Sequence, residues 1–124
     1  MDTQPISISP ETLHRSLGTA NAPLAIDVRR AAAFDADDRL IAGAIRRDPA
    51  TLGSWQGALP AARPIVAYCV HGHEVSQQVV AALRAAGRDA RYLAGGIADW
   101  VAQERPTRRK LGPSGKWVTT HRLP

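Results

Sequence analysis

The only cysteine of this 124-residue chain follows an apolar run that is typical of a buried strand. Cys69 comes directly after Ile65–Tyr68, and a short polar loop with one glycine and two histidines comes next. A thiol between the end of a strand and the start of a helix faces free backbone N–H groups, which favour the thiolate. Such a thiolate suits a nucleophile that handles small anions or transfers sulfur. The alternative is a cysteine that only fills a core position.

The residues after Cys69 are expected to form a concave site for a small anion. They are, in order, Val70, His71, Gly72, His73, Glu74 and Val75. Gly72 lets the backbone approach an anion closely, and successive N–H groups form an anion-binding nest at a helix N-terminus. The two histidines either donate hydrogen bonds to the anion or remain solvated. Together with Cys69 they also have a spacing that would hold zinc, but a loop of this kind turns its side chains outward, so we expect no metal.

The elements that must position Cys69 alternate between strands and helices. Short apolar runs predict strands at residues 24–28, 42–45 and 65–68, the alternation at residues 6–8 predicts a short edge strand, and residues 91–93 are expected to form a further strand. Helices are expected at residues 10 to about 18, 31–34, 49–59, 77–86 and 97–103. Ser9 is the expected N-cap of the first helix and Pro10 its first residue. The alternation is typical of an α/β domain with a mostly parallel sheet.

Asp27 and Arg29 fall at the end of a second predicted strand. Ligands of open parallel sheets bind beyond the carboxyl ends of the strands, so these residues are expected close to Cys69. We expect a salt link between them that supports the loop, and the alternative is direct contact with a substrate. Trp55 and Trp100 are expected in the core. Three more arginines are expected to add positive charge at the rim of the pocket: Arg30, Arg46 and Arg47.

Composition and charge distribution indicate which classes of partner this chain is expected to have. The 44% hydrophobic and 22% charged residues are ordinary for a soluble globular protein. The net charge of +5 comes from residues 105–124, which hold six basic and no acidic residues and leave residues 1–104 with a net charge of −1. We therefore expect a domain over residues 1–104 and a solvated basic tail with Pro and Gly over residues 105–124, and no nucleic-acid partner. A single cysteine, with no secretory signal and no membrane-spanning run, favours the cytoplasm and no membrane partner.

Four segments, in this order, resemble the single-domain rhodanese (sulfurtransferase) family. They are Ile-Asp-Val-Arg at 26–29 with Phe34, Ile-Ala-Gly-Ala-Ile at 41–45, Tyr-Cys-Val-His-Gly at 68–72 and the segment 92–100 that contains Gly95-Gly96. The resemblance covers about residues 6–104. It implies a rhodanese-like fold with a central, mostly parallel five-stranded sheet and helices on both faces. The sequence around Cys69 and the arginine-rich segments 44–49 and 106–110 are also similar to rhodanese modules associated with chromate resistance.

The resemblance implies a sulfurtransferase in which Cys69 is the catalytic nucleophile. Its thiolate attacks the outer sulfur of a donor such as thiosulfate, sulfite leaves, and a cysteine persulfide remains. The implied donor is a small sulfur-containing anion or a persulfide, the acceptor is a thiol or cyanide, and a redox protein is a further expected partner. No cofactor is implied. The alternative is a non-catalytic or regulatory module that binds an oxyanion or docks to a redox partner, with a link to chromate resistance.

Glu74 is the main departure from the family pattern. It occupies the sixth loop position, counting Cys69 as the first, where many family members carry arginine. An inward carboxylate about 4 Å from an anion would cost about 4 kcal/mol at an effective dielectric constant of about 20. An inward Glu74 therefore favours the regulatory module, and an outward one favours the enzyme.

Three smaller departures also concern the loop and its surroundings. The stretch from Cys69 to Gly87 is one residue longer than the usual family form. The seventh loop residue is Val75 instead of the arginine of the related phosphatases, so phosphatase activity is not expected. Leu40 stands where the family often has a histidine.

Overall fold

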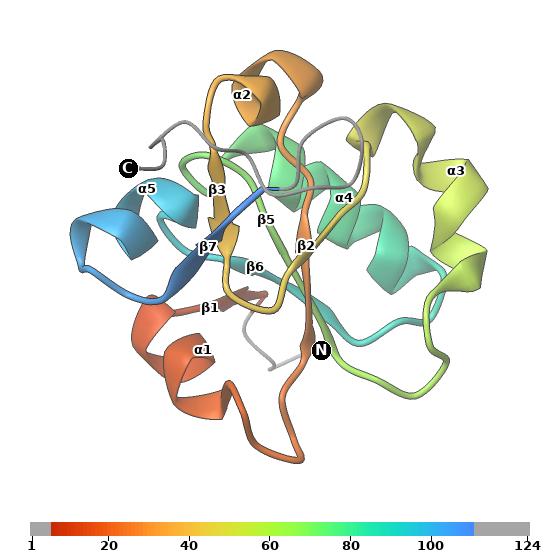
Figure 1. The fold of residues 1–124 in the computed structure, drawn as a ribbon. Coiled ribbons are helices and arrows are strands. Elements are labelled where there is room, and N and C mark those ends of the chain that lie inside the picture. Colours follow the sequence, from red (N-terminus) through yellow and green to blue (C-terminus); the bar gives the residue numbers. More distant parts are fainter. Residues whose placement is uncertain (1–5, 111–124) are drawn as a thin grey trace.

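The computed structural model describes residues 6–110, which form a three-layer α/β domain (Figure 1). Five strands form the central sheet in the order β1-β6-β5-β2-β4. Their bounds are β1 (Ser7–Ile8), β6 (Ala90–Leu93), β5 (Ile65–Tyr68), β2 (Leu24–Asp27) and β4 (Ile45–Arg46). All of its described strand pairings are parallel. The predicted five-stranded α/β sheet is therefore confirmed.

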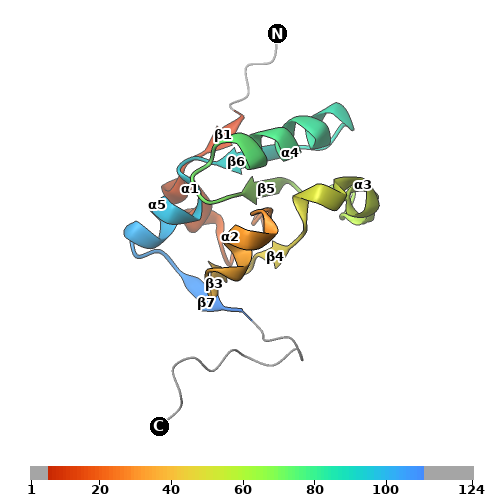
Figure 2. The same ribbon diagram turned by 90° about the horizontal axis from the view of Figure 1, so that it is seen from above.

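Helices cover both faces of this sheet (Figure 2). One face carries α1 (Pro10–Ser16) and α5 (Gly96–Ala102). The other face carries α3 (Leu52–Trp55), flanked by short 3₁₀ turns, and α4 (Glu74–Ala85). The short helix α2 (Ala31–Asp35) follows the carboxyl end of β2. No helix within residues 6–110 combines the length and the apolar character that crossing a bilayer requires.

The sheet separates two apolar clusters that hold the layers together. On the side of α3 and α4, Trp55 packs with Leu83 and with side chains of β2 and β5. On the side of α1 and α5, Trp100 packs with Leu13 and Tyr68. Trp55 and Trp100 are both buried, as predicted from the sequence. The burial of both faces of β5 explains why this strand is a continuous apolar run.

The start of α1 shows how local sequence determines an element. Ser9 is the N-cap, and its side chain accepts a hydrogen bond from the backbone N–H of Thr12 at 3.1 Å. Pro10 occupies the first helical position, where no backbone donor is needed. Both predictions for this helix start are confirmed.

A second, two-stranded sheet was not predicted from the sequence. Strand β3 (Arg39–Ile41) pairs antiparallel with β7 (Thr107–Arg109). The predicted strand over residues 42–45 is wrong in its bounds, because residues 42–44 form the turn between β3 and β4. The expectation of a solvated tail from residue 105 onward is wrong for residues 107–109, which form β7.

The segment after α5 packs on the domain through hydrogen bonds to α5 and to the turn after β3. The indole Nε1 of Trp100 donates to the carbonyl of Pro106 at 2.7 Å, and the backbone N–H of Ala42 donates to the same carbonyl at 3.1 Å. Arg109 forms an ion pair with Asp38. These contacts attach residues 105–110 to the folded domain, although the sequence predicted a domain limit at residue 104. The rest of the predicted tail, with Trp117, lies outside the described residues.

Candidate active site

Cys69 lies directly after β5, the middle strand of the sheet, and the residue is 6% exposed. The thiol donates a hydrogen bond to the Oγ atom of Ser76, in the first turn of α4, at 3.1 Å. After deprotonation, the sulfur accepts a hydrogen bond from the same hydroxyl group. The strand, the loop and the helix start therefore hold the sulfur between them.

Two opposing effects determine the pKa of Cys69. Burial of the thiol by itself raises the pKa, because it disfavours the charged form. Hydrogen bonds from the Ser76 side chain and from the backbone N–H groups of Ser76, Gly72 and His73 lower it. Together these donors hold the pKa of Cys69 below its ordinary value. The site is therefore built to stabilise negative charge on sulfur.

Only glycine fits at position 72 of the loop. Gly72 has φ +74°, and an added Cβ atom would lie 2.7 Å from the carbonyl oxygen of Leu93 and 2.8 Å from the nitrogen of Gly95. The carbonyl of Gly72 accepts a hydrogen bond from the side-chain amide of Gln77 at 3.0 Å. The loop is thus fixed between the end of β6 and the first turns of α4, which aims the N–H group of Gly72 at the sulfur.

The start of α5 holds the other side of the loop. The backbone N–H groups of Ile97 and Ala98 donate to the carbonyls of Cys69 and Val70 at 3.0 and 2.9 Å. Gly96 has φ +61°, and an added Cβ atom there would lie 2.4 Å from the carbonyl oxygen of Cys69. The Gly-Gly pair at the start of α5 therefore serves to let this helix approach the cysteine loop.

The predicted loop residues Val70, His71, His73, Glu74 and Val75 have different surroundings. Both histidines are exposed, with ring centroids 6.0 Å apart, and His73 is the N-cap of α4. Glu74 and Val75 belong to the first turn of that helix. Val70 and Val75 are half-buried. Within residues 6–110 no three His, Cys, Asp or Glu side chains are placed to hold a metal ion.

The side chain of Glu74 points toward solvent. It is 68% exposed, and its carboxylate lies 3.9 Å from the guanidinium of Arg30, which is 65% exposed. Gln78 also donates to this carboxylate at 3.4 Å. Of the two orientations considered from the sequence, the structure has the outward one.

Asp27 and Arg29 form the expected salt link, and it is fully buried. Nη2 of Arg29 lies 2.7 Å from the carboxylate of Asp27, and the side chains are 1% and 0% exposed. Nη1 of Arg29 donates to Asp37 at 2.9 Å, and Nη2 also donates to the carbonyl of Arg39 at 2.8 Å. These contacts direct the guanidinium toward β3 and toward Asp37, in the loop between α2 and β3. The pair holds the carboxyl end of β2 beside Cys69 rather than facing the sulfur.

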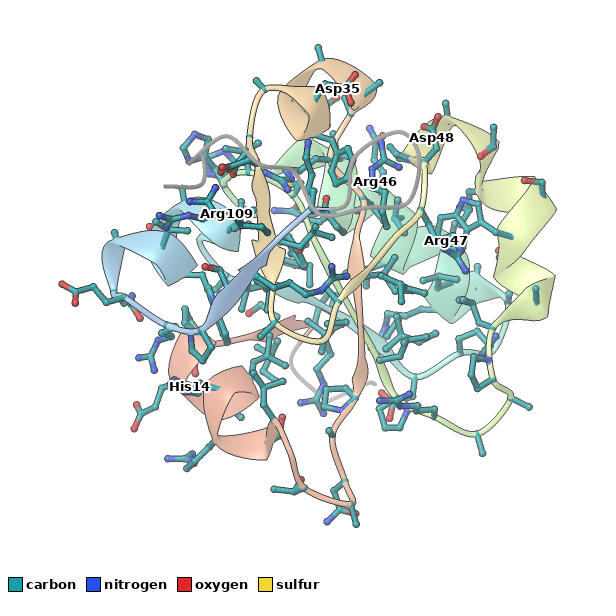
Figure 3. All side chains as sticks on the ribbon, viewed as in Figure 1. His14, Asp35, Arg46, Arg47, Asp48 and Arg109 are labelled. Atoms are coloured by element: carbon teal, nitrogen blue, oxygen red, sulfur yellow. The ribbon has the colours of Figure 1, made fainter. Side chains whose placement is uncertain are left out.

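The three arginines predicted at the rim of the pocket have different contacts. Arg30 reaches the loop through its ion pair with Glu74. The guanidinium of Arg46 stacks 4.5 Å from the ring centroid of Phe34 and donates to the carbonyl of Arg29 at 3.0 Å. Arg47 donates to the carbonyl of Arg46 at 2.7 Å. Figure 3 shows Arg46, Arg47 and Asp48 along the segment that leads from β4 to α3, with Asp35 of α2 above them.

Ser76 is the site residue that the sequence analysis did not single out. It is fully buried and contributes both its hydroxyl and its backbone N–H to the sulfur. Its position as the third residue of α4 is the signal that would have identified it, because the N–H groups of a first helical turn have no partner within the helix.

Comparisons with known proteins agree on the family and the fold. A family model described as "Rhodanese-like domain" matches residues 9–103. A full-length protein from Lactobacillus plantarum is 26% identical, with a TM-score of 0.77 over 85% of this chain and 88% of that one. A rhodanese-related protein from Thermoplasma volcanium is 23% identical, with a TM-score of 0.73 over 84% of this chain and 98% of that one.

One similar structure carries the name of an enzyme. A thiosulfate sulfurtransferase from Pseudomonas aeruginosa is 27% identical, with a TM-score of 0.71. The match covers 86% of this chain and 20% of that one, so the likeness concerns one part of a longer protein. A comparison with curated protein sequences finds no match.

Proposed function

Because the chain belongs to the rhodanese-like domain family, we propose that it is a sulfurtransferase that carries sulfane sulfur on Cys69. The proposal is supported by the hydrogen-bond donors that surround this sulfur. The hydroxyl of Ser76 lies 3.1 Å away, and backbone N–H groups of Gly72, His73 and Ser76 also donate toward it. A set of fixed donors of this kind stabilises a thiolate, a persulfide anion and a departing anion alike.

In the first half-reaction, the thiolate of Cys69 attacks the outer sulfur of a donor such as thiosulfate. A new S–S bond forms on Cys69, the S–S bond of thiosulfate breaks, and its electron pair leaves with sulfite. The charge is conserved, since thiolate and thiosulfate together carry the same charge as persulfide and sulfite. No external oxidant or reductant takes part in this exchange.

In the second half-reaction, cyanide or a thiolate attacks the outer sulfur of the Cys69 persulfide. The bond between the two sulfurs of the persulfide breaks, its electron pair returns to Cys69, and thiocyanate or a new persulfide leaves. The thiolate of Cys69 re-forms in this step, and the same hydrogen-bond donors stabilise it again. A lowered pKa makes Cys69 a good leaving group in this step.

The outward orientation of Glu74 supports the enzyme over the regulatory module. A carboxylate that is 68% exposed and 3.9 Å from Arg30 does not oppose an anion at the sulfur as an inward carboxylate would. The regulatory module, and with it the narrower likeness to chromate-resistance proteins, stays a sequence-based prediction that the matches above do not address. We further propose that the protein acts in a reducing compartment such as the cytoplasm, where thiols and redox proteins can receive sulfur from Cys69.

The test of the proposed function is turnover with thiosulfate and cyanide. We expect thiocyanate and sulfite to form in equal amounts with the wild-type chain, and neither to form with Cys69→Ser. Ser54→Ala is the matched control, because Ser54 is exposed on α3 and its hydroxyl donates to the carbonyl of Thr51. Turnover that survives Cys69→Ser contradicts the proposal. An anion that binds without any sulfur release favours the regulatory module.

A further inference from the structure

Six basic residues lie on the side of the domain that carries β3, β4 and β7 (Figures 1 and 2). Each belongs to one of these strands or directly follows one. We call them the basic face, and they are Arg39, Arg46, Arg47, Arg108, Arg109 and Lys110. The sulfur chemistry proposed for Cys69 uses none of them and does not account for their presence.

Carboxylates of the chain itself neutralise little of the basic face. Within residues 6–110 only one of its members, Arg109, forms an ion pair, with Asp38. Four others donate to backbone carbonyls instead, at 2.6 to 3.0 Å: Arg46, Arg47, Arg108 and Lys110. A carbonyl accepts a hydrogen bond without cancelling the charge of the donor. These cations are therefore held in place while their charge stays available to a binding partner.

Two members of the basic face lie directly opposite each other in the sheet of β3 and β7. The strand register pairs Arg39 with Arg109. Like charges directly opposite on paired strands weaken the pairing. Asp38 compensates the charge of Arg109, whereas the side chain of Arg39 is exposed and forms no ion pair with a described residue. The sheet thus holds the charge of Arg39 at a cost to its own stability, which indicates that this charge serves a contact with another molecule.

The ring of Phe34 fixes two further cations of the basic face. Nζ of Lys110 lies 4.2 Å from the ring centroid, and the guanidinium of Arg46 lies 4.5 Å from it. Nε of Arg46 is buried and has no hydrogen-bond partner among the described residues. Since both cations are positioned before any partner arrives, docking on them costs less conformational entropy than docking on freely rotating side chains.

The basic face adjoins the carboxyl edge of the central sheet, where Cys69 lies. The strand pairing places Arg46, Asp27 and Tyr68 in one row across β4, β2 and β5. Cys69 directly follows Tyr68, as Arg47 follows Arg46. Since neighbouring strands lie about 4.8 Å apart, the backbones of Arg47 and Cys69 are about 10 Å apart. A protein seated on the basic face therefore also covers the mouth of the cysteine loop.

We propose that the basic face docks an acidic protein whose cysteine accepts the sulfur of the Cys69 persulfide. This inference rests on the proposed function of Cys69 as a sulfur carrier. Carboxylates of the docked protein complement the cations, which speeds encounter and orients its cysteine. Three carboxylates lie among or beside the cations, those of Asp35, Asp38 and Asp48 (Figure 3). They repel a continuous polyphosphate backbone, so a protein surface with separate charges fits this face better than a nucleic acid does.

The transfer to the docked protein balances without a further reactant. Its cysteine thiolate attacks the outer sulfur of the Cys69 persulfide, and a bond forms between these two sulfurs. The S–S bond on Cys69 breaks, and its electron pair returns to Cys69 as a thiolate. The proton of the persulfide stays on the transferred sulfur, so the docked protein leaves as a persulfide.

The test measures sulfur transfer from the loaded chain to two synthetic peptides by mass spectrometry. Each peptide has one cysteine, which is flanked by glutamates in one peptide and by glutamines in the other. Arg39→Glu and Arg47→Glu are each expected to lower the ratio of the glutamate to the glutamine rate constant about threefold to tenfold, because both side chains are exposed on the basic face. Comparing this ratio between chains cancels the intrinsic reactivity of each peptide. Added salt is expected to lower the wild-type ratio by screening the charges.

Arg63→Glu is the matched control. Arg63 is also exposed and donates to the backbone carbonyls of Ala22 and Pro23, but it precedes β5 and lies at the opposite edge of the sheet from Cys69. It is expected to keep the wild-type ratio. If Arg39→Glu does not fold, Arg39→Gln removes the same positive charge. A ratio that the folded basic-face variants leave unchanged, or that Arg63→Glu lowers equally, overturns the docking proposal while Cys69 remains the sulfur carrier.

A binding measurement without chemistry separates this proposal from the proposed function. Fluorescence anisotropy of a labelled glutamate peptide gives its Kd for the Cys69→Ser chain, and Arg47→Glu in that chain is expected to raise the Kd about threefold to tenfold. An unchanged Kd overturns the docking proposal. A wild-type chain that takes up no sulfur overturns the role of Cys69, and the Kd alone then decides whether the face docks an acidic partner. A single-stranded oligonucleotide that binds more tightly than the peptide overturns the choice of an acidic protein.

Discussion

The Sγ atom of Cys69 lies 3.1 Å from the Oγ atom of Ser76, and the two residues flank the loop from opposite ends. Cys69 follows the middle strand of the sheet, and Ser76 is the third residue of α4. The contact therefore joins the sheet to the helix through the sulfur itself. It places the unpaired donors of a helix start around a thiol that the buried strand holds in position.

Replacement of Ser76 by alanine is expected to raise the pKa of Cys69. The variant loses the hydroxyl that lowers the pKa, while burial, which raises it, remains. Alkylation by iodoacetamide near neutral pH should slow about threefold to tenfold, because one pKa unit changes the thiolate fraction about tenfold. The rate is measured across a pH series. Equal slowing in Ser54→Ala, whose hydroxyl lies on α3, would show that the effect is not local to Cys69.

The stability of the fold should depend on pH through Cys69. Its pKa is lower in the folded chain than the ordinary value, so the unfolded chain binds more protons between the two pKa values. The stabilisation is complete above the unfolded pKa of about 8.5 and is lost as the pH falls through the folded pKa. Urea unfolding of the wild type and of Cys69→Ser at several pH values measures it. A difference between the two chains that stays constant with pH, or that shrinks as the pH rises, contradicts the lowered pKa.

Replacing Gly72 and Gly43 distinguishes the cost of backbone strain at positive φ from the cost of a steric clash of the added Cβ atom. Both have positive φ, +74° and +84°, but a Cβ atom at Gly72 meets backbone atoms at 2.7 and 2.8 Å, whereas one at Gly43 meets nothing within 4 Å. Gly43→Ala should lower the free energy of unfolding by about 1 kcal/mol through backbone strain alone. Gly72→Ala should cost more, at least about 2 kcal/mol, and should also slow Cys69 alkylation. Equal losses in the two variants would show that the contact with residues 93–95 is not what requires glycine.

Much of the fold follows from the sequence because the central strands are buried on both faces. The run at 65–68 is apolar throughout, the run at 24–28 is apolar except for Asp27, and α1 carries its own start signals at Ser9 and Pro10. The pairing of β3 with β7 is different. Both strands have three residues, they are far apart in the chain, and β7 reads Thr-Arg-Arg, so no alternation of apolar residues marks it.

The candidate site could be predicted in part, because some of its residues are recognisable from the local sequence. Cys69 and Gly72 are marked by residue type at the junction of a strand and a loop. The contribution of Ser76 depends on where α4 begins, and the predicted start at residue 77 was three residues later than the observed start at Glu74. The outward Glu74 lies beside Arg30, a neighbour that only the folded chain supplies.

The contacts of residues 105–110 should contribute to stability. A chain that ends at Lys110 keeps β7, the Arg109–Asp38 ion pair and the hydrogen bond from Lys110 Nζ to the carbonyl of Phe34 at 2.6 Å. A chain that ends at Glu104 loses all three. We expect the shorter chain to unfold at a temperature at least about 4–8 °C lower, which corresponds to about 1 kcal/mol. Equal melting temperatures in calorimetry would show that β7 adds no net stability.

The most direct test of the account is the intact mass of the protein after incubation with a sulfane sulfur donor. We expect the wild-type chain to gain the mass of one sulfur atom, to lose it again on addition of cyanide, and the Cys69→Ser chain to gain none. Thiosulfate and glutathione persulfide are each used as donor. A wild-type chain that gains no sulfur from either donor, or a Cys69→Ser chain that gains it as readily, would contradict the assignment of Cys69 as the sulfur carrier.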